Sequence, residues 1–434
     1  MTVRQEGGGA LARVVGLPGA ILLGLGSIVG TGAFVSIGIA AGVAGPTVLV
    51  AIAVGALLAT CNGLSSAQLA AAHPVSGGTY EYGYRFLSPS LGFSAGWMFL
   101  CAKSASAATA ALGFAGYALD LFGVTDSGWR IGLAVGAVCV LTFLVAGGMA
   151  RSNAANAAIV GFTLIVLGAF ALLGMPATLE RGAVTLAGTF AGVGDLRSLL
   201  EASALMFVAY TGYGRIATLG EEVTAPGRTI PRAIIVTLLV SALLYLGVGT
   251  VAVGSVGAEE LARLTAATAA PLEGAARSFA GPTLPLLLAL GAITAMLGVL
   301  LNLLLGLSRV LLAMARRRDA PGSLSVVEER TRSPRRAVLA VGAGIAAIAL
   351  IGDVRVTWSF SAFTVLIYYA LTNLAALRLP SEARLFPVWI SVAGLIGCLG
   401  LAFWVESGAL IAGLLLLVAG FGARTLFRRG RSST

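Results

Sequence analysis

The chain has 434 residues, of which 58% are hydrophobic and 11% are charged. Soluble proteins carry about 25% charged residues, so this composition excludes a soluble enzyme, a disordered chain and a disulfide scaffold. The formal charge of +10 would suit nucleic acid, but the arginines follow the ends of apolar runs, as membrane topology requires. We therefore expect a polytopic membrane protein in contact with lipids, and no nucleic-acid partner.

Hydrophobic runs of about 20 residues, the length of a transmembrane helix, recur along the chain. They predict twelve spans, at 14–42, 45–72, 91–120, 131–149, 154–175, 197–220, 231–256, 281–315, 335–352, 357–379, 385–405 and 407–423. With the N-terminus inside, the loops of that side and the two ends collect 20 of the 27 arginines. The positive-inside rule then places both termini in the cytoplasm, and we expect a multi-pass protein of the plasma membrane.

Three loops are longer than the others. Those at 176–196 and 257–280 are expected outside and the one at 316–334 inside. The segment 257–280 has enough Ala, Leu and Glu for a short surface helix that could act as a lid. No loop is long enough for a separate domain, so we expect one membrane domain over 1–434, with a basic cytoplasmic tail at 424–434.

Glycine interrupts two of the predicted spans. The first contains GLGSIVGTGAF, and the sixth contains AYTGYGRIATLG. If 1–175 and 197–379 are two halves of five spans each, the second half enters the membrane with the opposite orientation and the two segments are equivalent. Such a pair indicates the binding site of a secondary transporter, although glycines at this spacing also permit close helix packing.

A helix broken inside the membrane leaves backbone groups that a ligand can satisfy. Amides at the start of the second half of span one, at Thr31 and Gly32, would attract a carboxylate. Carbonyls at the ends of the first halves would attract an ammonium group. These carbonyls belong to Ile28, Val208, Ala209 and Thr211. A molecule with both groups on neighbouring atoms is an α-amino acid.

Four segments carry a family resemblance: GSIVGTGAF at 26–34, PVSGGTYEYGYRFLSPSLGFSAGW at 74–97, YTGYGRIATLGEEVTAPGRTIPRAI at 210–234 and SRVLLAMARRRDAP at 308–321. In this order they resemble the amino acid–polyamine–organocation transporters. The resemblance implies an all-α fold of 12 transmembrane helices, with a five-plus-five inverted repeat, discontinuous helices 1 and 6, and two additional helices at 385–423. It also implies alternating access and a substrate site at Ile28, Gly30, Thr31, Gly32, Phe207, Val208, Ala209, Tyr210 and Thr211.

The chain departs from the family pattern at three positions. Thr163 stands where proton-coupled members often place a lysine, and Gly214 stands where many members carry an acidic residue. Val208 stands where an aromatic gate is common, so Phe207 or Tyr210 would have to substitute for it.

Two cations lie within predicted spans, where a charge is a functional hypothesis by default. Lys103, the only lysine, lies near the middle of span three. It could replace the missing span-five lysine as a titrating or cavity-filling cation, or it could form a structural ion pair or bind carbonyls of a broken helix. Arg215 is a gate candidate that could pair with Glu221 or Glu222.

Thr163 and Thr294 complete the coupling candidates with Lys103. Thr294 in span eight could supply an oxygen ligand for Na⁺, but such a hydroxyl more often bonds a carbonyl of its own helix. No motif indicates a cofactor or any other metal site.

The sequence thus predicts a secondary transporter of an amino acid, with a neutral side chain as the expected substrate class. A permease for polyamines or other small organic cations is the alternative. An intramembrane enzyme or a channel has little support, because the chain has one histidine and no repeated filter or charge ring. Proton coupling, sodium coupling, exchange and the oligomeric state stay open.

Overall fold

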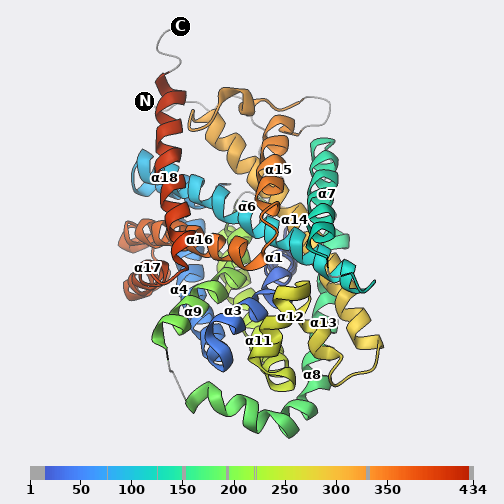
Figure 1. Cartoon of the computed structure of the whole chain (residues 1–434). Helices are drawn as coiled ribbons and strands as arrows, with labels where there is room; N and C mark the ends of the chain where they lie inside the picture. The colour runs from blue at the N-terminus through green and yellow to red at the C-terminus, as the bar shows by residue number, and fades with distance from the viewer. Residues whose placement is uncertain are drawn as a thin grey trace.

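A computed structural model describes residues 15–75, 77–124, 126–148, 153–191, 195–218, 220, 222–328 and 333–429, with backbone only at 153, 181–191 and 429. These residues form helices joined by short connections, and no β-sheet occurs among them beyond two isolated bridges. The helices pack side by side around a buried core (Figure 1).

The first half of the chain contains eight α-helices, some of them very short. They are α1 (Leu17–Ile28), α2 (Thr31–Phe34), α3 (Ser36–Ala44), α4 (Val48–Ala72), α5 (Thr79–Phe86), α6 (Pro89–Asp120), α7 (Ser127–Ala146) and α8 (Asn153–Ala191), with a 3₁₀ turn, η1 (Gly45–Thr47), before α4.

The second half begins with a helix that is followed directly by a 3₁₀ turn and a short helix. Its elements are α9 (Leu196–Tyr210), η2 (Thr211–Tyr213), α10 (Gly214–Ala217), α11 (Pro226–Val256), α12 (Ala258–Thr268), α13 (Pro271–Ala276), α14 (Thr283–Arg316), η3 (Gly322–Ser325), α15 (Arg335–Ala349), α16 (Val354–Leu377), η4 (Ser381–Ala383), α17 (Val388–Ala402) and α18 (Ser407–Arg429).

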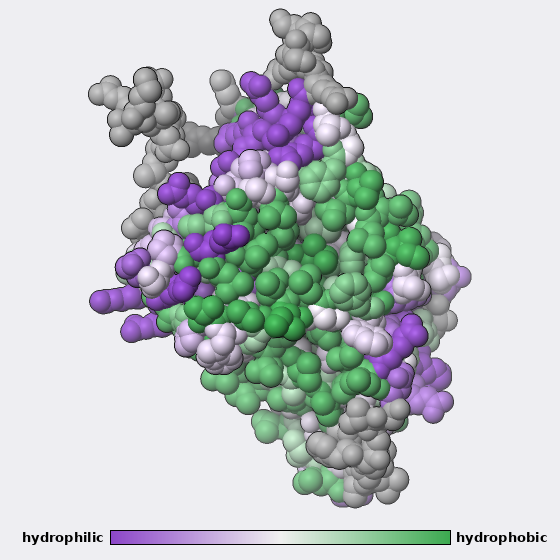
Figure 2. Space-filling model, turned by 90° about the vertical axis from the view of Figure 1, so that its left-hand side faces the viewer, coloured by the Kyte–Doolittle hydropathy of each residue, from purple (hydrophilic) through white to green (hydrophobic). Residues whose placement is uncertain are grey.

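Eight helical stretches among these residues are long and apolar enough to cross a membrane. The helices α1 and α17 are apolar but shorter, and α9 and α15 have only 15 residues each. The all-helical, multi-span character is therefore confirmed. Figure 2 shows the corresponding surface, a broad band of hydrophobic side chains bordered by hydrophilic patches.

The prediction of a loop at 176–196 was wrong, because α8 continues as a helix to Ala191. Pro176 lies inside this helix, and proline kinks a helix without necessarily ending it. Figure 1 shows the end of the helix running across the bottom of the molecule. The alanines and leucines that follow Pro176 favour continuation.

The helical prediction for 257–280 is confirmed by α12 and α13. The helix α12 packs closely on α3: a Cβ added to Gly38 would lie 2.0 Å from the Thr265 hydroxyl oxygen. The helices α12 and α13 therefore cover one end of the bundle, next to α3, which belongs to the second part of the first span.

Hydroxyl pairs join α6 to α16 in the centre of the molecule. Ser106 meets Ser361 and Thr109 meets Thr357, with 2.8 Å between the oxygens of each pair. Such bonds between helices help to fix their rotation in an apolar surrounding. They orient the face of α6 that carries Lys103.

Candidate functional site

The first span is interrupted at Val29 and Gly30, as predicted. The amides of Ala33 and Phe34 both donate to the Gly30 carbonyl at 3.0 Å, so α2 begins a new helical turn. No acceptor is described for the amides of Thr31 and Gly32, which are the two amides predicted to bind a carboxylate. The Thr31 hydroxyl is also buried without a partner among the described residues.

The interruption of span six lies directly against that of span one. A Cβ added to Gly212 would lie 2.3 Å from the Ser27 carbonyl oxygen, so only glycine fits between the two chains. A Cβ added to Gly32 would lie 2.4 Å from the Tyr245 hydroxyl oxygen and 3.1 Å from the Ala209 carbonyl oxygen. The glycines therefore bring the two breaks together.

The carbonyls predicted to bind an ammonium group already have donors from tyrosine and threonine. The Tyr245 hydroxyl lies 2.8 Å from the Ile28 carbonyl oxygen and 3.2 Å from that of Ala209. The Thr211 hydroxyl donates to the Val208 carbonyl at 2.7 Å. A carbonyl oxygen has two lone pairs, so those of Ile28 and Ala209 can each accept one further hydrogen bond from a ligand. The Val208 and Thr211 carbonyls already have two donors each: the Thr211 amide also donates to Val208, and the Gly214 amide and the Tyr369 hydroxyl donate to Thr211.

A cavity of about 930 Å³ adjoins both breaks. Ile28, Thr31, Gly32, Val208, Ala209 and Thr211 line it, whereas Gly30, Phe207 and Tyr210 do not. A Cβ on Gly30 would meet Val299. Phe207 instead packs against Tyr369, and Tyr210 against Tyr245, with ring centroids 5.6 and 5.0 Å apart.

Several residues that line the cavity were not predicted from the sequence, among them Phe99, Ser106, Asn302 and Trp358. Phe99 and Ser106 lie four residues before and three after Lys103, which puts all three on one face of α6. That spacing around the only lysine was a usable signal. Trp358 and Asn302 come from α16 and α14, and no local pattern distinguishes them.

Lys103 lines the cavity, and the residue is 8% exposed. Its ammonium donates to the Thr211 hydroxyl at 2.7 Å. No carboxylate forms a salt bridge with it within the described part of the chain. The lysine thus bridges α6 to the break in span six.

The other coupling candidates lie apart from this cavity. Thr163 donates to the Ile159 carbonyl at 2.7 Å, and Thr294 lies 2.8 Å from the Leu290 carbonyl oxygen. Both hydroxyls therefore bond carbonyls of their own helices. Among the described residues, no group of three or more His, Cys, Asp or Glu side chains could hold a metal ion.

Two of the gate candidates, Arg215 and Glu222, line the cavity, while Glu221 lies outside the described residues. No salt bridge joins Arg215 to Glu222 in the part of the chain that is described. The passage between them is therefore not closed by this pair.

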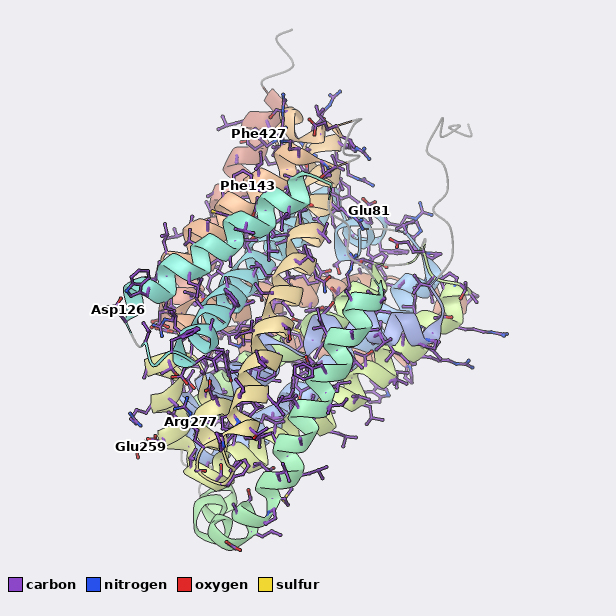
Figure 3. All side chains as sticks on the ribbon, turned by 90° about the vertical axis from the view of Figure 1, so that its right-hand side faces the viewer. Glu81, Asp126, Phe143, Glu259, Arg277 and Phe427 are labelled. Carbon is purple, nitrogen blue, oxygen red and sulfur yellow. The ribbon has the colours of Figure 1, made fainter. Side chains whose placement is uncertain are left out.

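The cavity reaches the surface near α5 and the end of α14. Its lining extends to Arg317, whose side chain is 42% exposed and pairs with Glu81. Burial raises the pKa of Glu81, and the positive charge of Arg317 opposes this effect. Figure 3 places Glu81 toward the same end of the molecule as Phe427, and Arg277 and Glu259 toward the other end.

The opposite end of the site is closed by packing between helices. The Tyr117 hydroxyl of α6 donates to the Phe34 carbonyl at 2.9 Å, and the Leu272 amide of α13 approaches the same hydroxyl at 3.4 Å. The site is thus open toward the end with Glu81 and shut toward the end with α12 and α13.

Comparison with known proteins supplies the family. Residues 19–431 match the model of a family described as amino acid permease. The chain belongs to the amino acid permease family. The observed helices, the two breaks and the shared cavity therefore belong to a transporter and not to an enzyme.

The names of relatives state different substrates, and some state none. An uncharacterized transporter of Mycobacterium tuberculosis is 40% identical over 430 residues, covering 98% of this chain and 94% of the relative. A branched-chain amino acid permease of Bacillus subtilis is 28% identical, over 75% of this chain and 72% of its own. The cationic amino acid transporter 3 of Arabidopsis thaliana is also 28% identical, over 79% and 58%.

Proposed function

We propose that the protein is a secondary active transporter of an amino acid that works by alternating access. The observation that carries this proposal is the pair of adjoining breaks on one cavity, where the amides of Thr31 and Gly32 have no acceptor among the described residues. The substrate carboxylate would bind these amides, where the helix dipole favours an anion. Its ammonium group would bind the free lone pairs of the Ile28 and Ala209 carbonyls.

This proposal includes the family architecture of twelve spans with an inverted repeat of 1–175 and 197–379, followed by two helices at 385–423. The arginine distribution supports cytoplasmic termini and a plasma-membrane location. On that orientation the end with Glu81 faces the cytoplasm, and the cavity is in its inward-open state. Closing it would bring Arg215 toward Glu222 or Glu221.

We assign coupling to Lys103 in preference to Thr163 or a sodium ion near Thr294. The lysine ammonium bonds the break in span six, whereas both threonine hydroxyls bond their own helices. Uptake by Lys103→Ala should lose the pH dependence shown by the wild-type protein in proteoliposomes. An unchanged pH profile in this variant would remove the lysine from the coupling mechanism.

The polyamine or organic-cation alternative is disfavoured by the cavity wall. Lys103, Arg215 and Arg309 all line it, and like charges repel a cationic substrate in a low-dielectric site. A cationic side chain would therefore meet repulsion on its way to the two breaks.

A thermal-shift screen over the amino acids tests the proposed function. A ligand that binds the folded protein raises its apparent stability, so at least one L-amino acid should raise the Tm in a saturable manner. Radiolabelled uptake of the same amino acid into proteoliposomes should saturate. Failure of every amino acid in both assays would refute the proposal.

A further inference from the structure

We propose that Lys103 selects substrates with a negatively charged side chain, so that acidic amino acids are the preferred class. This inference rests on the proposed function, since it assumes that the two helix breaks hold the α-carboxylate and the α-amino group. The juxtaposition that carries it is a buried ammonium beside those breaks, with no carboxylate partner among the described residues. This proposal differs from the neutral substrate that we expect from the sequence.

One part of the cavity wall is formed by Phe99, Lys103 and Ser106 of α6 with Trp358 of α16. Lys103 is the one charged residue among these four. The Ser106 hydroxyl is paired with Ser361. The lysine is therefore the charged donor that this wall offers to a side chain.

The ammonium of Lys103 has unused hydrogen-bonding capacity. An ammonium group has three donors, and one of them is bonded to the Thr211 hydroxyl at 2.7 Å. That hydroxyl donates onward to the Val208 carbonyl, so it accepts from the lysine without neutralising its charge. A buried charge left without a counter-ion is costly, and a ligand carboxylate would remove that cost.

The net charge of the substrate decides whether the buried ammonium of Lys103 gains a counter-ion. A neutral amino acid brings one positive and one negative α-group, which the two breaks take up, and it leaves Lys103 unpaired. A cationic amino acid adds repulsion. Only an acidic side chain brings the additional negative charge that pairs with the ammonium.

The route from the open end of the cavity also favours anions. Its cationic lining residues are Arg215, Arg309, Arg316 and Arg317, whereas its carboxylates are Glu81 and Glu222. Glu81 is already paired with Arg317. A passage with an excess of one charge raises the local concentration of the opposite ion.

The test compares two substrates that differ in charge and hardly in shape, L-glutamate and L-glutamine. Purified protein is reconstituted into proteoliposomes, and kcat/KM is measured for both. We expect the wild-type protein to prefer glutamate by roughly tenfold or more, the range of a charge-assisted bond. Lys103→Met should abolish this preference by lowering kcat/KM for glutamate relative to glutamine, and Lys103→Arg should retain it.

Arg263→Gln is the matched control, because it removes one positive charge from the exposed surface of α12 and should leave the ratio unchanged. Ligand-induced thermal stabilisation of the wild-type protein keeps the test decisive if Lys103→Met does not fold. Glutamate should raise the Tm more than glutamine does at equal concentration.

Two outcomes separate this inference from the proposed function. Saturable uptake of neutral amino acids, with no preference for glutamate and no stabilisation by it, would overturn the inference and leave an amino acid transporter. Absence of saturable uptake for every amino acid would overturn both.

Discussion

At the scale of single residues, the site depends on glycines that permit backbone to meet backbone. Gly212 is the example between the two breaks, since an added Cβ would lie 2.3 Å from the Ser27 carbonyl oxygen and 2.4 Å from its carbon. Backbone atoms cannot rotate away as a flexible side chain can. Any larger residue at this position must push the two broken helices apart.

Gly212→Ala is therefore expected to destabilise the protein by about 1–3 kcal/mol, the usual cost of overpacking, and to weaken substrate binding. Gly344→Ala in α15 is the matched control, because an added Cβ there meets no atom within 4 Å. Thermal denaturation of the two purified variants measures the difference. Equal Tm values would contradict the close contact between the breaks.

Glu273 in α13 predicts a pH dependence of stability. Burial raises its pKa to about 7, with a further contribution from Asp120, while Arg277 opposes the shift. A carboxyl group whose pKa is raised on folding favours the protonated folded state. Its contribution to stability is therefore present below its ordinary pKa of 4.5 and is lost as the pH rises through about 7.

Glu273→Gln should accordingly flatten the decline of Tm between about pH 5 and pH 8. The exposed Glu259 on the neighbouring α12 provides the control, since Glu259→Gln should preserve the wild-type slope. A slope that is identical in wild type and Glu273→Gln would assign the pH dependence to another group.

At the scale of helices, the carboxylate of Asp319 binds α18 to the helices near the open end of the cavity. Asp319 is fully buried and accepts from Arg424 at 2.8 Å and from Arg428 at 3.0 Å. The hydroxyls of Tyr80 and Tyr84, both on α5, also donate to it. The carboxylate thus connects α5, the end of α14 and the last helix.

Asp319→Asn should leave buried arginine charge without its partner, at a cost of about 3–5 kcal/mol. The expected result is a lower Tm and faster proteolysis of the C-terminal helix. Glu382→Gln, which changes an exposed carboxylate in η4, should have neither effect. Wild-type resistance of Asp319→Asn to protease would show that α18 is held by other contacts.

The sequence was most informative where a local rule has a direct consequence for the backbone. The glycines around Gly30 and Gly212 predicted the two interruptions, because glycine weakens a helix wherever it falls in the chain. Local reasoning failed at 176–196, where a loop was predicted and α8 continues through Pro176 to Ala191. The bonding of Asp319 and the placement of Trp358 depend on packing between distant helices, which no local pattern encodes.

The predicted site residues likewise divide into those that line the cavity and those that do not. Thr31 and Gly32 follow from the position of the break, and both line the cavity. Phe207 and Tyr210 were candidates by proximity in sequence, yet both point into aromatic contacts away from it. Which side of a short helix end faces a cavity is decided by its neighbours, so the sequence could not choose between them.

At the scale of the whole molecule, the low charge content and the uneven distribution of the arginines both fit a bundle of helices that spans a membrane. Hydrophobic side chains cover most of the face of the bundle shown in Figure 2, and a basic passage leads from one end to the paired breaks. For alternating access, that passage must close as the opposite end opens. A bulky residue placed in it should therefore block transport without disturbing the core.

Gly306 on α14 offers this test, because it lines the cavity and an added Cβ meets no atom within 4 Å. Gly306→Trp should abolish uptake while the purified protein keeps a Tm close to that of the wild type. Gly306→Ala, the control, should transport normally. Full uptake by the tryptophan variant would mean that substrate follows another route.

Counterflow in proteoliposomes tests the central claim most directly. Vesicles loaded with unlabelled L-amino acid should accumulate the labelled compound transiently above its external concentration, with saturable kinetics, and Gly212→Ala should reduce this overshoot. A flux that does not saturate, shows no overshoot and conducts at channel rates would contradict a carrier that binds an amino acid between two broken helices.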